Sequence, residues 1–441
     1  MSTAPGQPQP EAAARLASPA TLAGRLVCRP GQPPPHNLRS SRPDLVARLT
    51  SGRPAQALPG LLASLFSLCG QAHRLCATLA LQAAGGHAAP PTPAQRQSLR
   101  QHSLREHLQR ITLDWPRQLG DASAAESDAA GDGAARRLAS CPLWTPTAAP
   151  ADAAAITNDA LASTADWLQC HLFGQPLRDW LTAWDAAPAA ALQAWCQRRP
   201  SPTAGLLAAL LADPAAAGSA ALPGATPLRV HADAAALRAL AAQLQADAGW
   251  PRQPRWQAEC AETGSWTRLA EPAPQRFDSA ALRLGARLAE VARLALPDDG
   301  RRQGCDGLAL GALALAPGQA IAWVEMARGL LLHWLQLAPA AAAQPLGAQR
   351  GGAAAGEHGG AVADQRGDAV ADQRGGALVQ ACVVIAPTDW NFHPAGAVAA
   401  ALASTRTPAA LQALLAAYDP CVPCDLDTLP ATACAPGLSH A

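Results

Sequence analysis

The chain lacks an excess of charge of either sign. Among its 441 residues, Lys and Arg together number 34 and Asp and Glu together number 33, which leaves a formal net charge of +1. Proteins that bind a nucleic-acid backbone or an acidic membrane surface usually carry a clear basic excess. The composition therefore argues against a nucleic-acid partner.

The chain also lacks the uninterrupted hydrophobic runs that targeting and membrane insertion need. Its first residues contain no basic stretch followed by an apolar core, so we predict no secretory signal and expect a cytoplasmic protein. The longest uncharged run, residues 307–324, is interrupted at Pro317 and Gly318 and bracketed by Asp306 and Glu325. We predict a buried strand and turn there, and no membrane insertion.

Apolar residues, in contrast, are plentiful. A hydrophobic content of 49% with 15% charged residues is enough to bury a large core. Residues 1–55 are rich in Pro, Gly and Arg with little periodicity and are predicted to be a poorly ordered lead-in. The rest, residues 56–441, is predicted to be a single domain.

Helical spacing of apolar residues dominates that domain. It runs through residues 59–84, where Cys69 and Gly70 break it, and through residues 94–115. Residues 155–295 are rich in Ala and Leu and indicate several packed helices. The first helical segment therefore places Cys69 at a helix junction.

Strand-like segments follow residue 307. Residues 318–324, 330–337 and 378–386 are short, and the last is rich in β-branched side chains, which favours a small β-hairpin. Low-complexity residues separate its arms from about 338 to 376, including the tandem octads 361–368 and 369–376. Two copies are too few for a solenoid, so we predict a flexible insertion at the hairpin tip. The fold class is α+β and predominantly helical.

Clustered cysteines are the main candidates for chemistry. Cys421 and Cys424 form a Cys-x-x-Cys pair near the end of the chain, and Cys69 lies 352 residues earlier (421 − 69 = 352). Thiols at this spacing can point at one soft metal, and a third can join them if the fold brings it close. The pair by itself is equally typical of a zinc half-site or a reversible disulfide.

Four segments, in order along the chain, resemble the conserved elements of the large subunit of nickel-iron hydrogenases. The first is similar to an Arg-Ile-Cys-Gly-x-Cys element, and the second to Glu-Ala-Pro-Arg-Gly-x-x-x-His-Trp. The third is similar to Val-Val-Pro-Thr-x-Trp-Asn, and the fourth matches the terminal Asp-Pro-Cys-x-x-Cys. They are SLCGQAHRLCATLA (67–80), EMARGLLLHWL (325–335), VVIAPTDWN (383–391) and DPCVPC (419–424), with a weaker fifth match in LREHLQRITLDW (104–115).

Departures from those elements matter as much as the matches. In the large subunit four thiolates hold nickel and iron; Cys69, Cys421 and Cys424 align with three of them, whereas Ala72 occupies the fourth position, which bridges the two metals. Asp427 replaces the histidine at which a maturation protease cuts. The resemblance therefore implies a large-subunit-like body that holds an incomplete metal site beside the hairpin.

This combination resembles the HupK-type accessory proteins of hydrogenase assembly. The resemblance implies a scaffold, rather than a catalyst, that holds an iron fragment carrying cyanide and carbon monoxide before transfer to the hydrogenase large subunit. It implies the large-subunit precursor and HypC-type chaperones as partners. Loss of a bridging thiol disfavours nickel and a redox-active enzyme, while a plain thiol or zinc site at Cys421 and Cys424 stays open.

Further residues take roles from the same resemblance. Arg328 would lie over the metal near the diatomic ligands, although pairing with a carboxylate is the simpler alternative. Asp419 would lie beside the site or cap the turn before Pro420. The remaining candidates are Thr388 and Asn391, which would organise the loop after the second strand or contact the ligand; His73 and Cys76, substitute ligands or packing residues; and Glu106 and His107, neighbours of the site or a solvated helix face.

Overall fold

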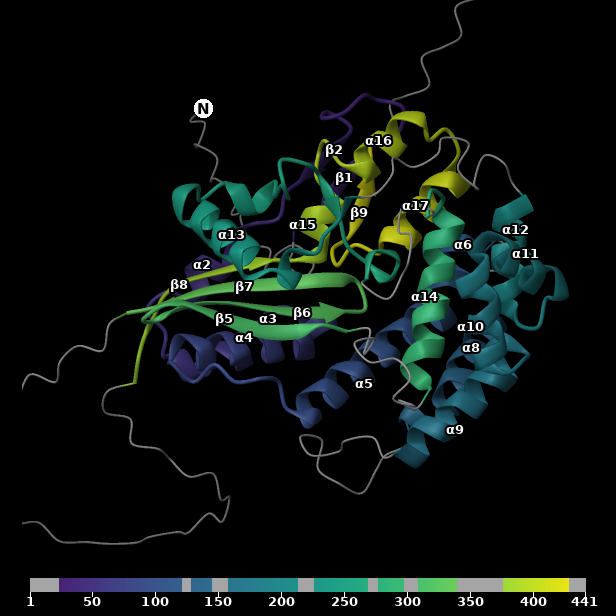
Figure 1. The fold of residues 1–441 in the computed structure, drawn as a ribbon. Helices are drawn as coiled ribbons and strands as arrows, with labels where there is room; N and C mark the ends of the chain where they lie inside the picture. The colour runs from purple at the N-terminus through teal and green to yellow at the C-terminus, as the bar shows by residue number, and fades with distance from the viewer. Residues whose placement is uncertain are drawn as a thin grey trace, which may run out of the picture.

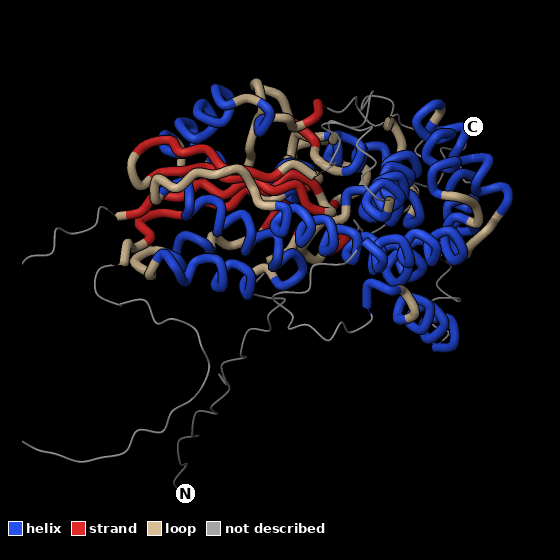
Figure 2. The backbone as a smooth tube through the Cα atoms, turned by 60° about the horizontal axis from the view of Figure 1, so that its bottom comes forward, coloured by secondary structure: helices blue, strands red, loops and turns tan. Residues whose placement is uncertain are grey.

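The computed structural model describes residues 24–120, 128–144, 158–212, 226–268, 277–296, 308–338 and 376–427. The predicted insertion at about 338–376 lies, apart from its two end residues, outside the described residues. Two parts lie side by side in the described chain: an antiparallel sheet flanked by helices, and a body of packed helices (Figures 1 and 2).

The sheet has four antiparallel strands in the order β5-β6-β7-β8. It is larger than the predicted hairpin because residues of the long uncharged run add a strand. The bounds are β5 Leu310–Ala316, β6 Gln319–Met326, β7 Gly329–Leu337 and β8 Val379–Ile385. β7 and β8 pair with Leu332 opposite Ile385, so the predicted pairing across the insertion is confirmed.

Both faces of the sheet are covered. Helix α4 (Gly70–Ala84) packs on one face with α3 (Leu58–Leu65) against it, and α13 (Ala234–Ala246) lies over the other face (Figure 1). Side chains alternate between faces along a strand, so Leu331 and Leu335 join the main core while Leu332 joins the cluster beneath α13. His333 consequently points toward α4.

The helical body surrounds α14 (Ala280–Ala295), which Ser279 caps by accepting a hydrogen bond from the backbone N–H of Leu282. Its neighbours carry three fully buried tryptophans, Trp180, Trp184 and Trp195, which confirms the packed helices predicted for residues 155–295. The other helices of this body are α5 Pro93–Gln109, α6 Trp115–Leu119, α8 Asp128–Ala139, α9 Asn158–Leu168, α10 Leu177–Ala186, α11 Pro188–Arg198 and α12 Pro202–Ala212.

The C-terminal part leads from the end of β8 back to the helical body, where α17 packs on α14. It consists of α15 (Pro387–Asn391), α16 (Ala397–Ser404) and α17 (Pro408–Tyr418), followed by the short strand β9 (Cys424–Leu426). Thr407 caps α17 by accepting from the N–H of Ala410. A separate two-stranded parallel pair joins β3 (Thr226–Pro227) to β4 (Ala261–Glu262).

The prediction that residues 1–55 are poorly ordered is wrong for residues 24–55, which the structure describes. From residue 24 onward the chain forms β1 (Leu26–Cys28), β2 (Leu38–Ser40) and α2 (Leu45–Thr50). β1 is the middle strand of a second sheet, antiparallel to β2 and parallel to β9. The order of these residues comes from pairing with a strand some 400 positions away, which local periodicity cannot reveal.

The fold class is therefore α+β and mostly helical, as predicted. Within the described residues, no helix is both long and apolar enough to cross a lipid bilayer.

Candidate metal-binding site

Cys69 lies at the junction predicted from the sequence. A 3₁₀ turn, Ser67–Cys69, joins α3 to α4, and Cys69 is the residue before the first turn of α4. The junction is tight, since a Cβ atom on Gly70 would come 2.6 Å from the carbonyl oxygen of Ala63. Glycine after the cysteine thus allows α3 and α4 to meet closely and holds the Cys69 thiol in a buried position.

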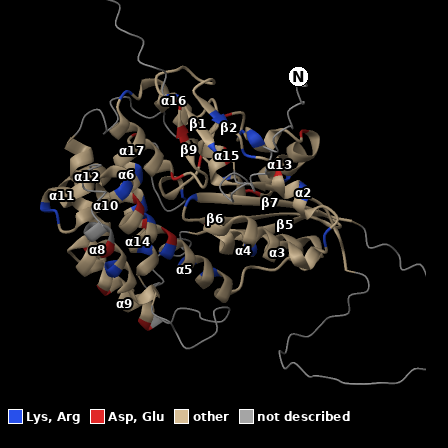
Figure 3. Cartoon of the chain, turned by 180° about the vertical axis from the view of Figure 1, so that it is seen from behind, with Lys and Arg blue, Asp and Glu red and all other residues tan. Residues whose placement is uncertain are grey.

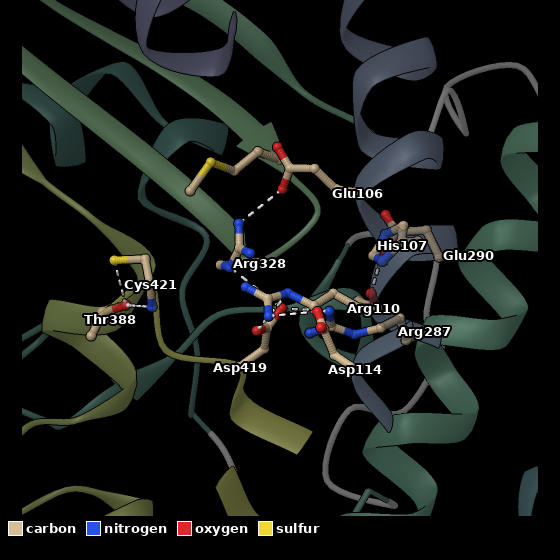
Figure 4. A network of polar contacts seen from close by, with 12 residues as sticks. Glu106, His107, Arg110, Asp114, Arg287, Glu290, Arg328, Thr388, Asp419 and Cys421 are labelled. Carbon is tan, nitrogen blue, oxygen red and sulfur yellow. Dashed lines mark hydrogen bonds and ion pairs between the residues drawn. The ribbon is translucent and has the colours of Figure 1, made fainter. Parts of the chain in front are cut away.

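Cys421 reaches the same region from the other end of the chain. Helix α17 ends at Asp419, which adopts the left-handed conformation (φ 45°), and Pro420 then directs the chain out of the helix. Thr388 fixes the cysteine twice: its Oγ1 accepts from the backbone N–H of Cys421 at 3.1 Å and lies 3.1 Å from Sγ (Figure 4).

The two thiols lie close enough to interact electrostatically. Burial raises the pKa of Cys69, a negative charge on Cys421 raises it further, and the guanidinium groups of Arg328 and Arg42 offset part of the effect. The negative charges of both cysteines in turn help to raise the pKa of both arginines. Cys69 and Cys421, from opposite ends of the chain, therefore lie within electrostatic range of each other and of both arginines. Burial keeps Cys69 protonated at neutral pH.

Arg328 projects from the turn between β6 and β7. Gly329 follows it at φ 131°, where an added Cβ would come 2.6 Å from Thr263 Oγ1, so glycine is required there. The guanidinium donates to Glu106 at 2.9 Å and lies 3.3 Å from Asp419 (Figure 4). Arg328 thus pairs with carboxylates, as the simpler alternative held, and lies within electrostatic range of both thiols. Its role near diatomic ligands stays a prediction.

Asp419 is the centre of an ion network. Besides Arg328, it receives Arg287 at 2.7 Å and Arg110 at 3.2 Å. Burial opposes its ionisation, but the three guanidinium groups outweigh that cost and lower the pKa of Asp419 well below its ordinary value. Asp419 also ends α17 through its backbone N–H, which donates to Leu415, so it caps the helix and neighbours the site at once.

Cys424 points elsewhere. Its Sγ donates to the carbonyl oxygen of Val422 at 3.9 Å. The side chain of Cys28 on β1, burial, and the charge of Cys421 all raise the pKa of Cys424. Cys28 and Cys421 therefore both influence Cys424, while Cys421 also influences Cys69. Binding of one metal by Cys69, Cys421 and Cys424 together stays a prediction.

His73 and Cys76 occupy the face of α4 that packs on the sheet. His73 Nδ1 lies 3.1 Å from His333 Nε2, and its ring stacks on Phe66 with the ring centroids 4.0 Å apart. Cys76 is fully buried beside the backbone of His333 and near Cys382. The structure thus places Cys76 within the core and away from the thiol pair, while His73 lies near Arg42.

Asn391 and His107 support the architecture around the site. The Asn391 side chain accepts from the N–H of Thr263 at 2.9 Å and donates to the Thr263 carbonyl at 2.8 Å, tying α15 to the segment beneath the β6–β7 turn. His107 lies 3.0 Å from Glu290. Glu106, in contrast, contacts Arg328 directly, and burial raises the pKa of Glu106 despite the opposing effect of that cation.

Within the part of the chain that the structure describes, no three His, Cys, Asp or Glu side chains are grouped so as to hold a metal ion. The site therefore offers pairs of thiols rather than a closed tetrahedral cage.

Comparison with known proteins identifies the family. No family model matches the sequence. The hydrogenase expression/formation protein HoxV of Cupriavidus necator is 39% identical over 412 residues, covering 91% of this chain and 94% of that protein. The chain belongs to this family. HupK of Bradyrhizobium diazoefficiens, a hydrogenase expression/formation protein, is 28% identical over 88% of the chain and 90% of its own length. The predicted membership of the HupK-type group is confirmed.

Solved hydrogenases are also similar to the structure, at low sequence identity. The Ni-Fe-Se hydrogenase from D. vulgaris Hildenborough aligns with a TM-score of 0.44 at 13% identity, covering 87% of this chain and 92% of that chain. An NAD+-reducing [NiFe]-hydrogenase aligns with a TM-score of 0.43 at 16% identity, covering 87% and 91%.

Sequence reasoning missed several residues around the thiols. Arg42 follows β2 in a segment read as poorly ordered, and no motif marks it. Arg110 begins a π-turn, Arg110–Asp114, between α5 and α6, a distortion that often accompanies functional sites but leaves no spacing signal. Cys28 belongs to no cysteine cluster in the sequence, and no motif marks Arg287.

Proposed function

We propose that this hydrogenase expression/formation protein is an assembly scaffold that holds an iron fragment carrying cyanide and carbon monoxide, and later releases it to the hydrogenase large subunit. The observation that supports the proposal is that Cys69 and Cys421, 352 residues apart in sequence, lie within electrostatic range of each other and of the guanidinium groups of Arg42 and Arg328.

Thiolate sulfur atoms are suitable ligands for the proposed iron fragment. Low-spin iron with strong-field diatomic ligands is a soft centre, and thiolates are soft donors. Burial keeps the Cys69 thiol protonated in the metal-free chain, so each bond to iron replaces a proton. Binding is therefore expected to release protons and to weaken as the pH falls.

Arg328 and Arg42 are suitable partners for the cyanide ligands of the proposed fragment. A cyanide nitrogen accepts hydrogen bonds, and a guanidinium group donates them while offsetting negative charge. Arg328 is held in place by Glu106 and Asp419, and Arg42 by an ion pair with Asp389. Asp389 is itself fixed, because it accepts the backbone N–H of Ala386 at 2.8 Å. Both donors are therefore positioned before cargo arrives.

The incomplete donor set favours a carrier over a catalyst. Ala72, buried on α4, supplies no sulfur where the large subunit has its fourth thiolate, so a bridged nickel-iron pair is disfavoured. Transfer runs downhill when the acceptor binds the fragment more tightly than the donor does. The partners in this proposal are the large-subunit precursor, as acceptor, and a HypC-type chaperone.

Anaerobic purification followed by infrared spectroscopy and metal analysis tests the proposal. We expect bands in the cyanide and carbonyl stretching region with bound iron, and their loss in Cys421→Ala. Cys170→Ala is the control, since Cys170 is exposed on the helical body, and it should keep both. Zinc without such bands would favour the plain thiol site and contradict the scaffold.

A further inference from the structure

The partner strand of the C-terminal Cys-x-x-Cys motif brings a cysteine of its own. β1 and β9 pair in parallel, with Leu26 opposite Cys424 and Cys28 opposite Leu426. Paired residues share a face of the sheet, and residues two apart on a strand share it too. Cys28 and Cys424 therefore project from the same face as diagonal neighbours.

The two side chains are close enough to influence each other. The side chain of Cys424 lowers the pKa of Cys28 and outweighs the opposing effect of burial. Cys28 is fully buried, whereas Cys424 is half-buried and also neighbours Cys421.

Several contacts hold this arrangement. The N–H of Leu26 donates to Pro423 at 2.9 Å, and the N–H of Asp427 donates to Cys28 at 3.0 Å, so the strands are bonded on both sides of the cysteine pair. Arg25 pairs with Asp425, and Arg29 with Asp427 at 2.8 Å. Asp427 occupies the position of the histidine in the large-subunit motif, and these two contacts hold the end of β9 against Cys28 and Arg29.

We propose that Cys28 is a thiolate ligand for the cargo, and that it pairs with Cys424 on iron to replace the sulfur that Ala72 lacks. The inference rests on the proposed function for the identity of its cargo. Each thiol loses its proton to solvent as its sulfur–iron bond forms, and the oxidation state of iron does not change. The two thiol pairs, Cys28 with Cys424 and Cys69 with Cys421, then offer sulfur donors along one path.

Cys28→Ser tests the assignment, with Cys141→Ser as the control because Cys141 is equally buried but lies in the helical body. After anaerobic purification, iron content and cyanide and carbonyl band intensity should fall at least about tenfold in Cys28→Ser, since even outer groups of metal sites change affinity by that much. The control should retain them. Equal intensity in both variants would overturn the inference while leaving the proposed function intact.

A second readout separates the two proposals. Titration of the metal-free chain with Cd²⁺, followed by the ultraviolet absorption of cadmium–thiolate bonds, should show a smaller signal in Cys28→Ser than in Cys141→Ser. If the native chain carries no cyanide or carbonyl bands but this difference appears, the scaffold function fails while Cys28 stands as a metal ligand. Identical Cd²⁺ titrations would contradict the role of Cys28.

Discussion

Replacing Asp419 with asparagine removes the carboxylate with which Arg328, Arg287 and Arg110 all form ion pairs. The side chains of Arg328 and Arg287 are each only 3% exposed, so water cannot solvate their guanidinium groups when the carboxylate is lost. Asparagine keeps the shape and the backbone N–H that ends α17. The substitution therefore isolates the charge.

The size of the effect follows from burial. Each ion contact is worth about 4 kcal/mol at an effective dielectric constant of 20, but desolvation offsets most of that gain. Breaking a buried pair, in contrast, leaves an uncompensated cation and costs about 3–5 kcal/mol. We expect the free energy of unfolding of Asp419→Asn to fall by that amount.

Asp425→Asn is the matched control. It also breaks an ion pair with an arginine, Arg25, but the two side chains are 41% and 46% exposed. Exposed pairs contribute about 0–1 kcal/mol. Urea unfolding of both variants, followed by circular dichroism, measures the difference. A loss below about 1 kcal/mol in Asp419→Asn, or one equal to that of the control, would refute the view that the buried ion pairs of Asp419 stabilise the folded chain.

Two further predictions concern pH and the turn that carries Arg328. Burial opposes the charge of Glu290, but Arg268 and His107 outweigh it and lower the pKa of Glu290 to about 2; its stabilising contribution should be complete above pH 4.5 and disappear as the pH falls from 4.5 toward 2. Acid titration of unfolding should therefore show a smaller loss over that range in Glu290→Gln, and an unchanged slope would count against the assignment. Gly329→Ala should destabilise the chain by about 1–3 kcal/mol, because alanine is strained at φ 131° and its Cβ would strike Thr263; Gly52→Ala, at a positive φ with nothing within 4 Å, should cost less, and equal losses would show that the clash with Thr263 is unimportant.

Local signals predicted the elements that carry the site. The break at Cys69 and Gly70 was visible because glycine interrupts an otherwise helical apolar pattern, and the approach of Ala63 explains it. The β6–β7 turn was visible as short apolar runs around Arg328. In both cases the sequence feature and its structural cause lie within a few residues of each other.

Long-range pairing was not visible. β1 and β9 are each three residues long, and each is ordered by the other across the whole chain. Their pairing brought Cys28 to Cys424, which no spacing rule indicates. Buried cations such as Arg287 were missed for a related reason: on a helix they look like solvated charges until the carboxylate that neutralises them is located. Figure 3 shows basic and acidic positions close together on α14 and the helices beside it.

The infrared spectrum of the anaerobically loaded chain, recorded before and after addition of metal-free hydrogenase large-subunit precursor, tests the carrier account most directly. The account predicts cyanide and carbonyl bands that leave this chain and reappear on the separated precursor, together with the iron. Bands that stay with the chain in the presence of excess precursor, or a loaded chain that shows none at all, would contradict it.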